Sequence, residues 1–243
     1  MSILEDRDDV KSRAKEAYEG LEEIWPETDA WSTHTRRSIT KVIDRFVGER
    51  YRAILNAGCG NNDYGLSKWA SCINLDLSLQ QCRRMKSAIV ADVESIPFGE
   101  NYFDATMCVG AVLNYVEPYD AIPELARVTR PGGLILVDFE TTNSAELLFT
   151  GHWAKRVGII ERSYAGRSDK TFLFSSHHIR TILEQNQISI TATHYYHLTT
   201  AVWHRAFSNS RLPSMILPAD EWLNRIPGLR FFASNVIFVC RKN

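Results

Sequence analysis

An apolar run that ends abruptly in glycines is the feature that most constrains the fold of this chain. Residues 52–57 read Arg-Ala-Ile-Leu-Asn-Ala, and Gly58, Cys59 and Gly60 follow directly. Such a run, broken by small residues, is typical of a buried strand that ends in a tight turn. Glycine has no Cβ, so the backbone there can approach a ligand closely. The sequence therefore predicts a strand, a glycine turn and a ligand site beside that turn.

Strand-like and helix-like segments alternate after this turn. Short apolar runs read as strands, and segments with apolar residues three and four apart read as helices. Strict alternation favours parallel βαβ units with right-handed crossovers, which is the α/β class. The predicted strands are 72–76, 87–91, 105–109 and 134–139, and the predicted helices are 65–70, 79–85 and 118–128.

Two acidic residues stand at the ends of predicted strands. Asp76 follows Gly60 by sixteen residues and closes the second strand. A carboxylate in that place can accept hydrogen bonds from both hydroxyls of a ribose. Asp92 closes the third strand and is followed by Val93, a pair suited to the amine edge and the face of an adenine. The alternative for Asp92 is an ordinary turn cap, a common role for aspartate.

Taken together, these residues resemble the class I S-adenosylmethionine (SAM)-dependent methyltransferases. They are most similar to the small-molecule group related to the ubiquinone and menaquinone biosynthesis enzymes. Four segments carry the resemblance in the order and spacing of that family. A nicotinamide-binding Rossmann domain would share the glycine turn and Asp76 but not the later loops. The four segments are 54–62, 74–77, 91–104 and 112–133.

The resemblance implies a fold and a cofactor. The expected fold is a Rossmann-like, doubly wound sheet of seven strands, mostly parallel, with an antiparallel last strand, N-terminal helices and lid insertions. Segments 188–198 and 232–239 fit the last two strands. The implied cofactor is SAM, with S-adenosylhomocysteine as its product. The residues that the family pattern assigns to it are Ala57, Gly58, Cys59, Gly60, Asp76, Leu77, Asp92, Val93, Val109, Gly110 and Tyr115.

The chain departs from the family pattern at two positions of the glycine turn. Asn56 stands where the family usually has an acid that helps to hold the methionine amine. Its amide can accept a hydrogen bond but brings no charge. Asn62 replaces a third glycine, and asparagine tolerates left-handed geometry better than most residues. Both changes raise the question of weaker or different cofactor binding.

We expect one methyltransferase domain over 1–243, made of a helical cap (1–50), a SAM-binding core (51–140) and a substrate-side region (141–243). Apolar spacing predicts helices over 8–24 and from a cap at Ser32 or Thr33 onward. Either these helices pack on the edge of the sheet, or they form a lid with Tyr18, Trp31 and His34 facing the ligand. Residues 141–167 read as an irregular insertion and 200–229 as a second insertion broken by prolines, and both are expected on the substrate side.

Methyl transfer from a sulfonium needs alignment more than acid–base chemistry, because the leaving group is neutral. A base is an optional addition. The candidate bases are His197, at the end of the sixth predicted strand, and His152, in the first insertion. Glu140 is a further candidate for a substrate contact, with the capping of a turn as its alternative.

Composition excludes several classes. The net charge of −1 gives no electrostatic case for nucleic acid, and no apolar run approaches the ~20 residues of a membrane span. The five cysteines show no CxxC or Cys/His spacing, so neither a metal site nor a disulfide framework is predicted. We expect a cytoplasmic protein without a signal peptide, as a monomer or homodimer.

The sequence thus predicts a SAM-dependent enzyme that methylates a small, aromatic or apolar metabolite by in-line displacement. Two alternatives remain. One is a regulatory protein that binds SAM or S-adenosylhomocysteine without turnover, and the other is a nicotinamide-dependent oxidoreductase on a similar sheet.

Overall fold

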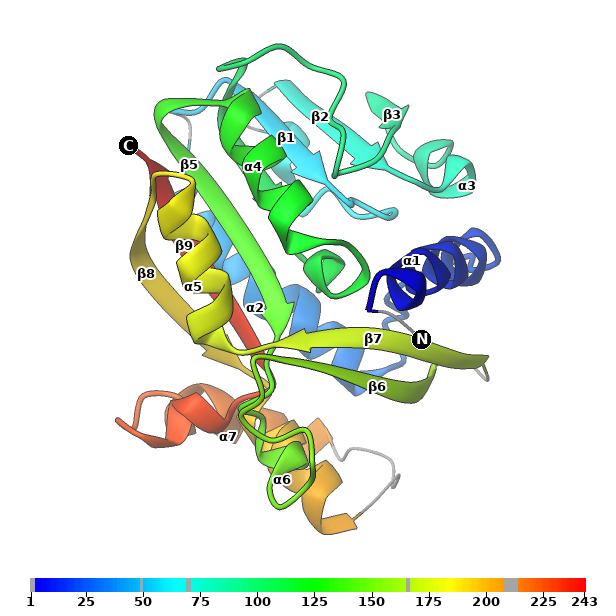
Figure 1. Ribbon diagram of the computed structural model, residues 1–243, viewed down its shortest axis with the longest axis vertical. Coiled ribbons are helices and arrows are strands. Elements are labelled where there is room, and N and C mark those ends of the chain that lie inside the picture. The colour runs from blue at the N-terminus through cyan, green and yellow to red at the C-terminus, as the bar shows by residue number, and fades with distance from the viewer. Residues whose placement is uncertain (1–2, 49, 69–70, 165–166, 208–213) are drawn as a thin grey trace.

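The apolar runs of the chain assemble into one twisted sheet in the computed structural model (Figure 1). The structure describes all residues except 1–2, 49, 69–70, 165–166 and 208–213. The strand order is β3-β2-β1-β4-β5-β9-β8, and the sixth position is antiparallel to both neighbours. The strands are β1 (Ala53–Ala57), β2 (Ser71–Asp76), β3 (Ala88–Val90), β4 (Phe103–Cys108), β5 (Thr129–Glu140), β8 (Ile188–Tyr196) and β9 (Asn235–Lys242). The predicted seven-stranded fold class is therefore confirmed.

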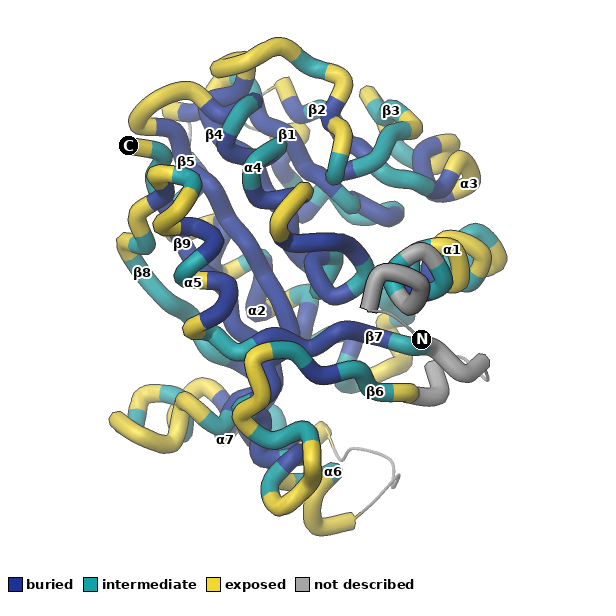
Figure 2. The backbone as a smooth tube through the Cα atoms, in the orientation of Figure 1, coloured by how far each residue is buried: buried dark blue, intermediate teal, exposed yellow. Residues whose placement is uncertain are grey.

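Helices cover both faces of the sheet. On one face, α4 and α5 pack over β4, β5 and β9, and on the other face α2 packs against β1, β4 and β5 (Figure 1). Figure 2 shows the central strands buried and the helices exposed along their outer sides, which is the burial expected of a doubly wound sheet. The helices are α1 (Ile3–Glu19), α2 (Ala30–Phe46), α3 (Leu79–Cys82), α4 (Pro118–Val128), α5 (Ser176–Gln185), α6 (Leu198–Phe207) and α7 (Leu217–Leu223).

Several element boundaries differ from the prediction because local caps decide them. Asp29, rather than Ser32 or Thr33, caps α2 by accepting from Ser32 N at 2.7 Å, so the helix starts earlier. The first helix ends at Glu19, before Gly20, and not near Pro26. The predicted helix 65–70 is reduced to one 3₁₀ turn, η1 (Leu66–Lys68), with residues 69–70 outside the described part. The remaining 3₁₀ turns are η2 (Val112–Tyr115), η3 (Ala145–Leu147), η4 (Ser214–Ile216) and η5 (Leu229–Phe232).

The first insertion was wrongly predicted to be irregular. It contains an antiparallel pair, β6 (Val157–Tyr164) and β7 (Arg167–Phe174), which extends from the sheet toward α1 (Figure 1). Val157 lies opposite Phe174, and Glu161 lies opposite Lys170. Opposite charges on facing positions stabilise such a pair. Apolar alternation is confined to short stretches, Val157 with Ile159 and Phe172 with Phe174, which is too little to predict the pair from the sequence.

Asn114 fastens this pair to the sheet. Its side chain is fully buried in η2, accepts from Glu140 N at 2.8 Å, and donates to the carbonyl oxygens of Glu140 and Phe172. One side chain thus satisfies backbone groups of β5 and β7 that water cannot reach.

We expect Asn114→Asp to lower the free energy of unfolding by about 3 kcal/mol, because the buried carbonyls lose their donor. Asn243→Ala is the matched control, since its side chain is exposed and accepts from Ser189 Oγ at the surface. Urea unfolding of both variants tests the expectation, and equal midpoints would contradict it.

Candidate functional site

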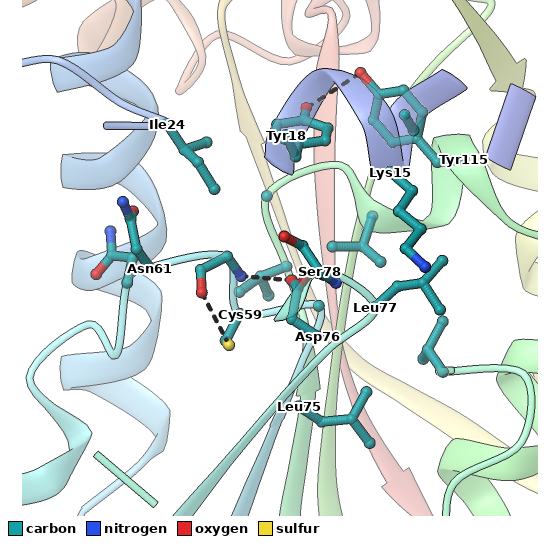
Figure 3. Close-up of a pocket in the computed structure, with 18 of the residues that line it drawn as sticks. Lys15, Tyr18, Ile24, Cys59, Asn61, Leu75, Asp76, Leu77, Ser78 and Tyr115 are labelled. Carbon is teal, nitrogen blue, oxygen red and sulfur yellow. Dashed lines mark hydrogen bonds between the residues drawn. The ribbon is translucent and has the colours of Figure 1, made fainter. Parts of the chain in front are cut away.

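A cavity of about 340 Å³ lies at the carboxyl ends of β1, β2, β3 and β4. Its floor is formed by the turn after β1 and its walls by the ends of the neighbouring strands, and α1 lies across it (Figure 3). In an open parallel sheet this edge is where ligands bind. The size is within the range of pockets for small molecules and cofactors.

The glycine turn has a geometry that other residues could not adopt without strain. Gly58 and Gly60 have φ angles of 72° and 53°. A Cβ on Gly58 would lie 2.4 Å from Val112 Cγ2, and one on Gly60 would lie 2.4 Å from Ile24 Cδ1. Backbone bonds fix the turn, because Gly58 N and Cys59 N both donate to the carbonyl of Leu75, at 2.7 and 3.0 Å. The predicted turn is therefore a rigid floor of bare backbone.

Asp76 faces this turn from the end of β2. Its Oδ2 accepts from Gly60 N at 2.7 Å and its Oδ1 from Ser78 N at 2.8 Å (Figure 3). Burial raises the pKa of Asp76, and the backbone donors Ser78 and Gly60 oppose that rise. Each oxygen keeps a second lone pair, so the carboxylate can accept two further hydrogen bonds from a ligand.

Helix α1 closes the cavity from above. Lys11 forms ion pairs with both Asp92 and Glu94 at the end of β3. Tyr18 OH lies 3.3 Å from Tyr115 OH, and Gln81 Nε2 donates to Tyr18 O at 2.5 Å. Charged and polar contacts therefore hold the helix over the strand ends. Of the two alternatives for the first helix, its place over the cavity agrees with the lid.

Asp92 combines the two roles considered from the sequence. Its Oδ1 accepts from Glu94 N at 3.0 Å, as in a turn cap, while Oδ2 pairs with Lys11. Asp92 also lines the cavity beside Val93. A ligand amine would therefore share this carboxylate with Lys11.

An aromatic wall, made of Trp25 and Tyr64, forms part of the cavity lining. Trp25 and Tyr64 lie edge to face with ring centroids 5.9 Å apart. Gly110, with φ of 85°, brings the end of β4 so close that a Cβ would lie 3.0 Å from the Trp25 ring. Tyr18 and Tyr115 also line the cavity, which therefore has apolar surface edged with hydroxyls.

A buried carboxylate supports the Gly110 turn from behind. Asp138 Oδ2 accepts from Gly110 N at 2.9 Å and from Ala111 N at 3.0 Å, and Tyr196 OH donates to the same group. Burial raises the pKa of Asp138 to about 7, although hydrogen bonds from Tyr196 and the two backbone amides oppose the shift. Asp138 is thus a carboxyl that changes protonation near neutral pH directly beneath the cavity wall.

Asn56 lies behind the turn rather than in the cavity. The residue is 1% exposed, and its Nδ2 donates to Asn62 O at 2.9 Å and to Asn74 Oδ1 at 3.0 Å. An aspartate could not donate these two hydrogen bonds. The asparagine therefore stabilises the turn internally, and its Oδ1 is buried without a hydrogen-bond partner in the described structure.

His197 lies outside the cavity. It is fully buried, stacks on Trp31 with ring centroids 4.9 Å apart, and bonds Thr35 through Nε2 and Thr200 through Nδ1. His34 contacts the same ring edge to face and bonds Asp220 at 3.0 Å. Trp31 and His34 therefore pack here instead of facing the cavity. His197 has the surroundings of a packing residue.

His152 and Glu140 also lie away from the cavity lining. His152 is half-buried in the loop after η3, where its backbone N donates to Thr150 Oγ1 at 3.2 Å. Glu140 is 8% exposed at the end of β5, where its backbone N donates to Asn114.

The cavity lining agrees with most of the predicted cofactor positions. Every one of them lines it except Ala57, which is buried beneath the turn. Half of the additional lining residues come from the N-terminal region, and only the helical spacing of that region and its tryptophans gave a signal for these. They are Lys11, Ala14, Lys15, Tyr18, Glu23, Ile24, Trp25 and Arg36.

Comparison with known proteins identifies a known domain in the central part of this chain. Residues 55–137 match the family described as a methyltransferase domain. A malonyl-[acyl-carrier protein] O-methyltransferase from Enterobacter lignolyticus is 34% identical over 143 residues, covering 54% of this chain and 55% of that protein. A demethylmenaquinone methyltransferase from Paenarthrobacter aurescens is 33% identical over 112 residues, covering 43% and 44%. The chain thus matches about half the length of these curated relatives.

A solved structure shares the fold over the whole chain. The 1,6-didemethyltoxoflavin-N1-methyltransferase from Burkholderia thailandensis, with bound 1,6-didemethyltoxoflavin and S-adenosylhomocysteine, superposes with a TM-score of 0.59. The match covers 100% of this chain and 91% of that one at 13% identity. At this identity the likeness concerns the fold alone.

The pKa of Asp138 gives a pH-dependent expectation. A carboxyl whose pKa is raised on folding stabilises the native state below its unfolded pKa, and that contribution is lost as pH rises through about 7. The loss between pH ~4 and ~7 is roughly 4 kcal/mol at most, at about 1.4 kcal/mol per pKa unit. Asp138→Asn should abolish this part of the pH dependence in urea unfolding, whereas Asp44→Asn, on an exposed position of α2, should retain it. If the free energy of unfolding changed with pH in the same way for Asp138→Asn and the parent protein, the raised pKa would not belong to Asp138.

Proposed function

We propose that this chain, which belongs to the class I SAM-dependent methyltransferases, transfers a methyl group from SAM to a small molecule of aromatic or apolar character. The observation that carries the proposal is the single cavity in which the bare glycine turn and the Asp76 carboxylate face each other. That pairing suits a nucleoside joined to a short polar chain.

The residues present fit SAM on three observations. Gly58, Gly60 and Gly110 leave no room for side chains where the cofactor would contact backbone. Asp76 keeps free acceptor capacity for two ribose hydroxyls. Glu23 and Arg36 line the same cavity, and their charges are opposite to those of the ammonium and carboxylate of the methionine part. We assign Leu77, Val93 and Tyr115 to apolar contacts with the cofactor.

When bound, SAM supplies an electrophilic methyl group attached to a sulfonium sulfur. Once the methyl group is transferred, that sulfur is left as a neutral thioether. The chain's own contribution is then alignment and exclusion of water. Helix α1 covers the reacting groups, held there by Lys11 with Asp92 and Glu94. Trp25 and Tyr64, packed edge to face, form an apolar wall against which the ring of an acceptor would be oriented.

The acceptor class rests on this aromatic wall. A small cavity closed by a helix favours a metabolite over a macromolecule. The related Burkholderia enzyme binds a compact heteroaromatic molecule by its description, which agrees with this size and character. The whole chain, as one domain with a helical cap, a core and a substrate-side region, would form the enzyme.

The state of the cysteines bears on the compartment in which the protein works. The five cysteines, Cys59, Cys72, Cys82, Cys108 and Cys240, are buried free thiols, which supports work in a reducing compartment such as the cytoplasm. Within the described residues, no helix is both long and apolar enough to cross a membrane.

Turnover is the decisive test. Labelled SAM mixed with the protein and fractionated metabolite extracts should release S-adenosylhomocysteine only with fractions that contain the acceptor. SAM binding without turnover on any fraction would favour the non-catalytic binder, and calorimetric binding of NAD alone would overturn the proposal. The family match and the relatives do not favour these two alternatives.

Asp76→Ala should weaken S-adenosylhomocysteine binding by about 1–3 kcal/mol, because charged hydrogen bonds to the ribose are lost. Asp44→Ala on the exposed side of α2 is the matched control and should bind as the parent does. Titration calorimetry checks both. An unchanged affinity of Asp76→Ala would show that the ribose lies elsewhere.

The catalytic assignments of His197 and His152 stay predictions, and their positions outside the cavity lining set the expected outcome. His197→Gln should lower thermal stability through lost contacts with Thr35 and Trp31 while the folded fraction keeps its kcat. His152→Ala should leave kcat and KM unchanged. A large loss of kcat in either folded variant, with normal S-adenosylhomocysteine binding, would restore that histidine as a base.

A further inference from the structure

A second concave site lies on the other flank of α2. It is a groove of about 430 Å³ between α2, the edge strand β8 and α7. Figure 1 shows α7 beyond the end of β8, on the side of the sheet away from α1. The groove and the SAM cavity share no lining residue. The neighbours Arg36 and Arg37 diverge, because Arg36 lines the cavity and Arg37 lines the groove.

We propose that this groove, the α2–α7 groove, binds the phosphate group of a small phosphorylated molecule. The binding would be separate from that of SAM. It does not depend on the function proposed above.

Positive charge is concentrated on both walls of the groove. Arg37, Lys41 and Arg45 recur every four residues, so they share one exposed face of α2. Arg225 and Arg230 come from the opposite wall, after α7. The whole chain carries a net charge of −1, so this concentration is local and not a property of the protein surface in general.

The acidic residues of the groove are already engaged. Asp220 is 1% exposed and accepts from His197 N at 2.9 Å, from Thr199 N at 2.7 Å and from His34 at 3.0 Å. Burial would raise the pKa of Asp220, but the hydrogen bonds of His34 and Thr199 hold it at about 2, so it stays charged and satisfied.

Glu221 is shared by two cations, Lys41 and Arg225. Among the described residues, Arg37, Arg45 and Arg230 have no carboxylate partner. Arg45 and Arg230 instead lie over aromatic rings, Arg45 over Phe46 at 5.3 Å and Arg230 over Tyr195 at 5.8 Å. Three guanidinium groups are thus left to bind an anion.

The surface between the walls fits a phosphate ester. Guanidinium forks match the geometry of phosphate oxygens and bind them with two hydrogen bonds. Tyr195 is half-buried in the groove and offers a ring against which the rest of the molecule can pack. Burial lowers the pKa of His194, the nearby Lys41 and Arg45 lower it further, and Glu221 and Asp220 oppose that shift.

The size of the groove favours a small molecule over a nucleic acid. Its volume is that of a drug-sized ligand site. Nucleic-acid binding normally needs a basic stripe along many phosphates, and an excess of acidic over basic residues does not suit it.

Titration calorimetry of the full chain with inorganic pyrophosphate tests the proposal. The expected result is saturable binding at one site that weakens as salt is added. The double variant Arg37→Gln with Arg45→Gln should bind at least about tenfold more weakly, because charged hydrogen bonds to the phosphate oxygens are lost. Arg83→Gln, exposed and outside both linings, is the matched control and should bind as the parent does.

The Glu221→Gln variant should change pyrophosphate affinity in the opposite direction from the arginine variants. It releases Lys41 and Arg225 from their carboxylate, so pyrophosphate should bind more tightly than to the parent. S-adenosylhomocysteine affinity, measured on every variant, should not change and serves as the check on folding.

Three results would overturn the proposal. They are absence of saturable pyrophosphate binding, equal weakening by Arg83→Gln and the double variant, and weaker binding to Glu221→Gln. Binding of single-stranded RNA in the absence of pyrophosphate binding would also overturn it, in favour of a macromolecular ligand.

Discussion

The hydrogen bond from Gly60 N to Asp76 Oδ2 joins the two strand ends on which the whole site depends. It fixes the glycine turn of β1 against the end of β2, while Gly58 N and Cys59 N bond the backbone of the same strand through Leu75 O. The Asp76 carboxylate therefore fixes the floor of the cavity and also lines it. The same group supports the turn and remains available to a ligand because each oxygen has two lone pairs.

The rest of the cavity is built by longer-range contacts onto this floor. Helix α1 is attached to the ends of β2 and β3 through Lys11 and the Gln81 side chain, and it is the element that makes the site closed. At the other end, Asp138 positions the Gly110 turn from beneath. Apolar packing adds to these ionic and polar contacts, because Val10 of α1 is fully buried in the hydrophobic core.

Helix α2 has a different part in the molecule. Its apolar face, with Ile39 and Ile43, packs on the sheet, while its two flanks face separate hollows. The cluster of Trp31, His197 and Asp220 fastens its first turns to β8 and α7. One rigid helix thus forms a wall of the SAM cavity and a wall of the α2–α7 groove.

The sequence by itself determined the elements whose signals are local. The strand and glycine turn at 52–60, the strand-end Asp76 and the family pattern up to Gly133 predicted the sheet, its antiparallel last strand and the cofactor. Each of these depends on neighbours along the chain: an apolar run, a residue without Cβ, an acid at fixed spacing.

The tertiary structure alone decided what depends on residues far apart in the chain. It placed Lys11 on Asp92, buried His197 under Trp31, turned Asn56 inward and paired β6 with β7. Nothing beside these residues in the sequence encodes such partners, because the contacts form only when the folded sheet brings distant segments together. A histidine at a strand end gives the same sequence pattern whether its ring contacts a ligand or packs on a tryptophan. Only the folded structure shows which of these two contacts it makes.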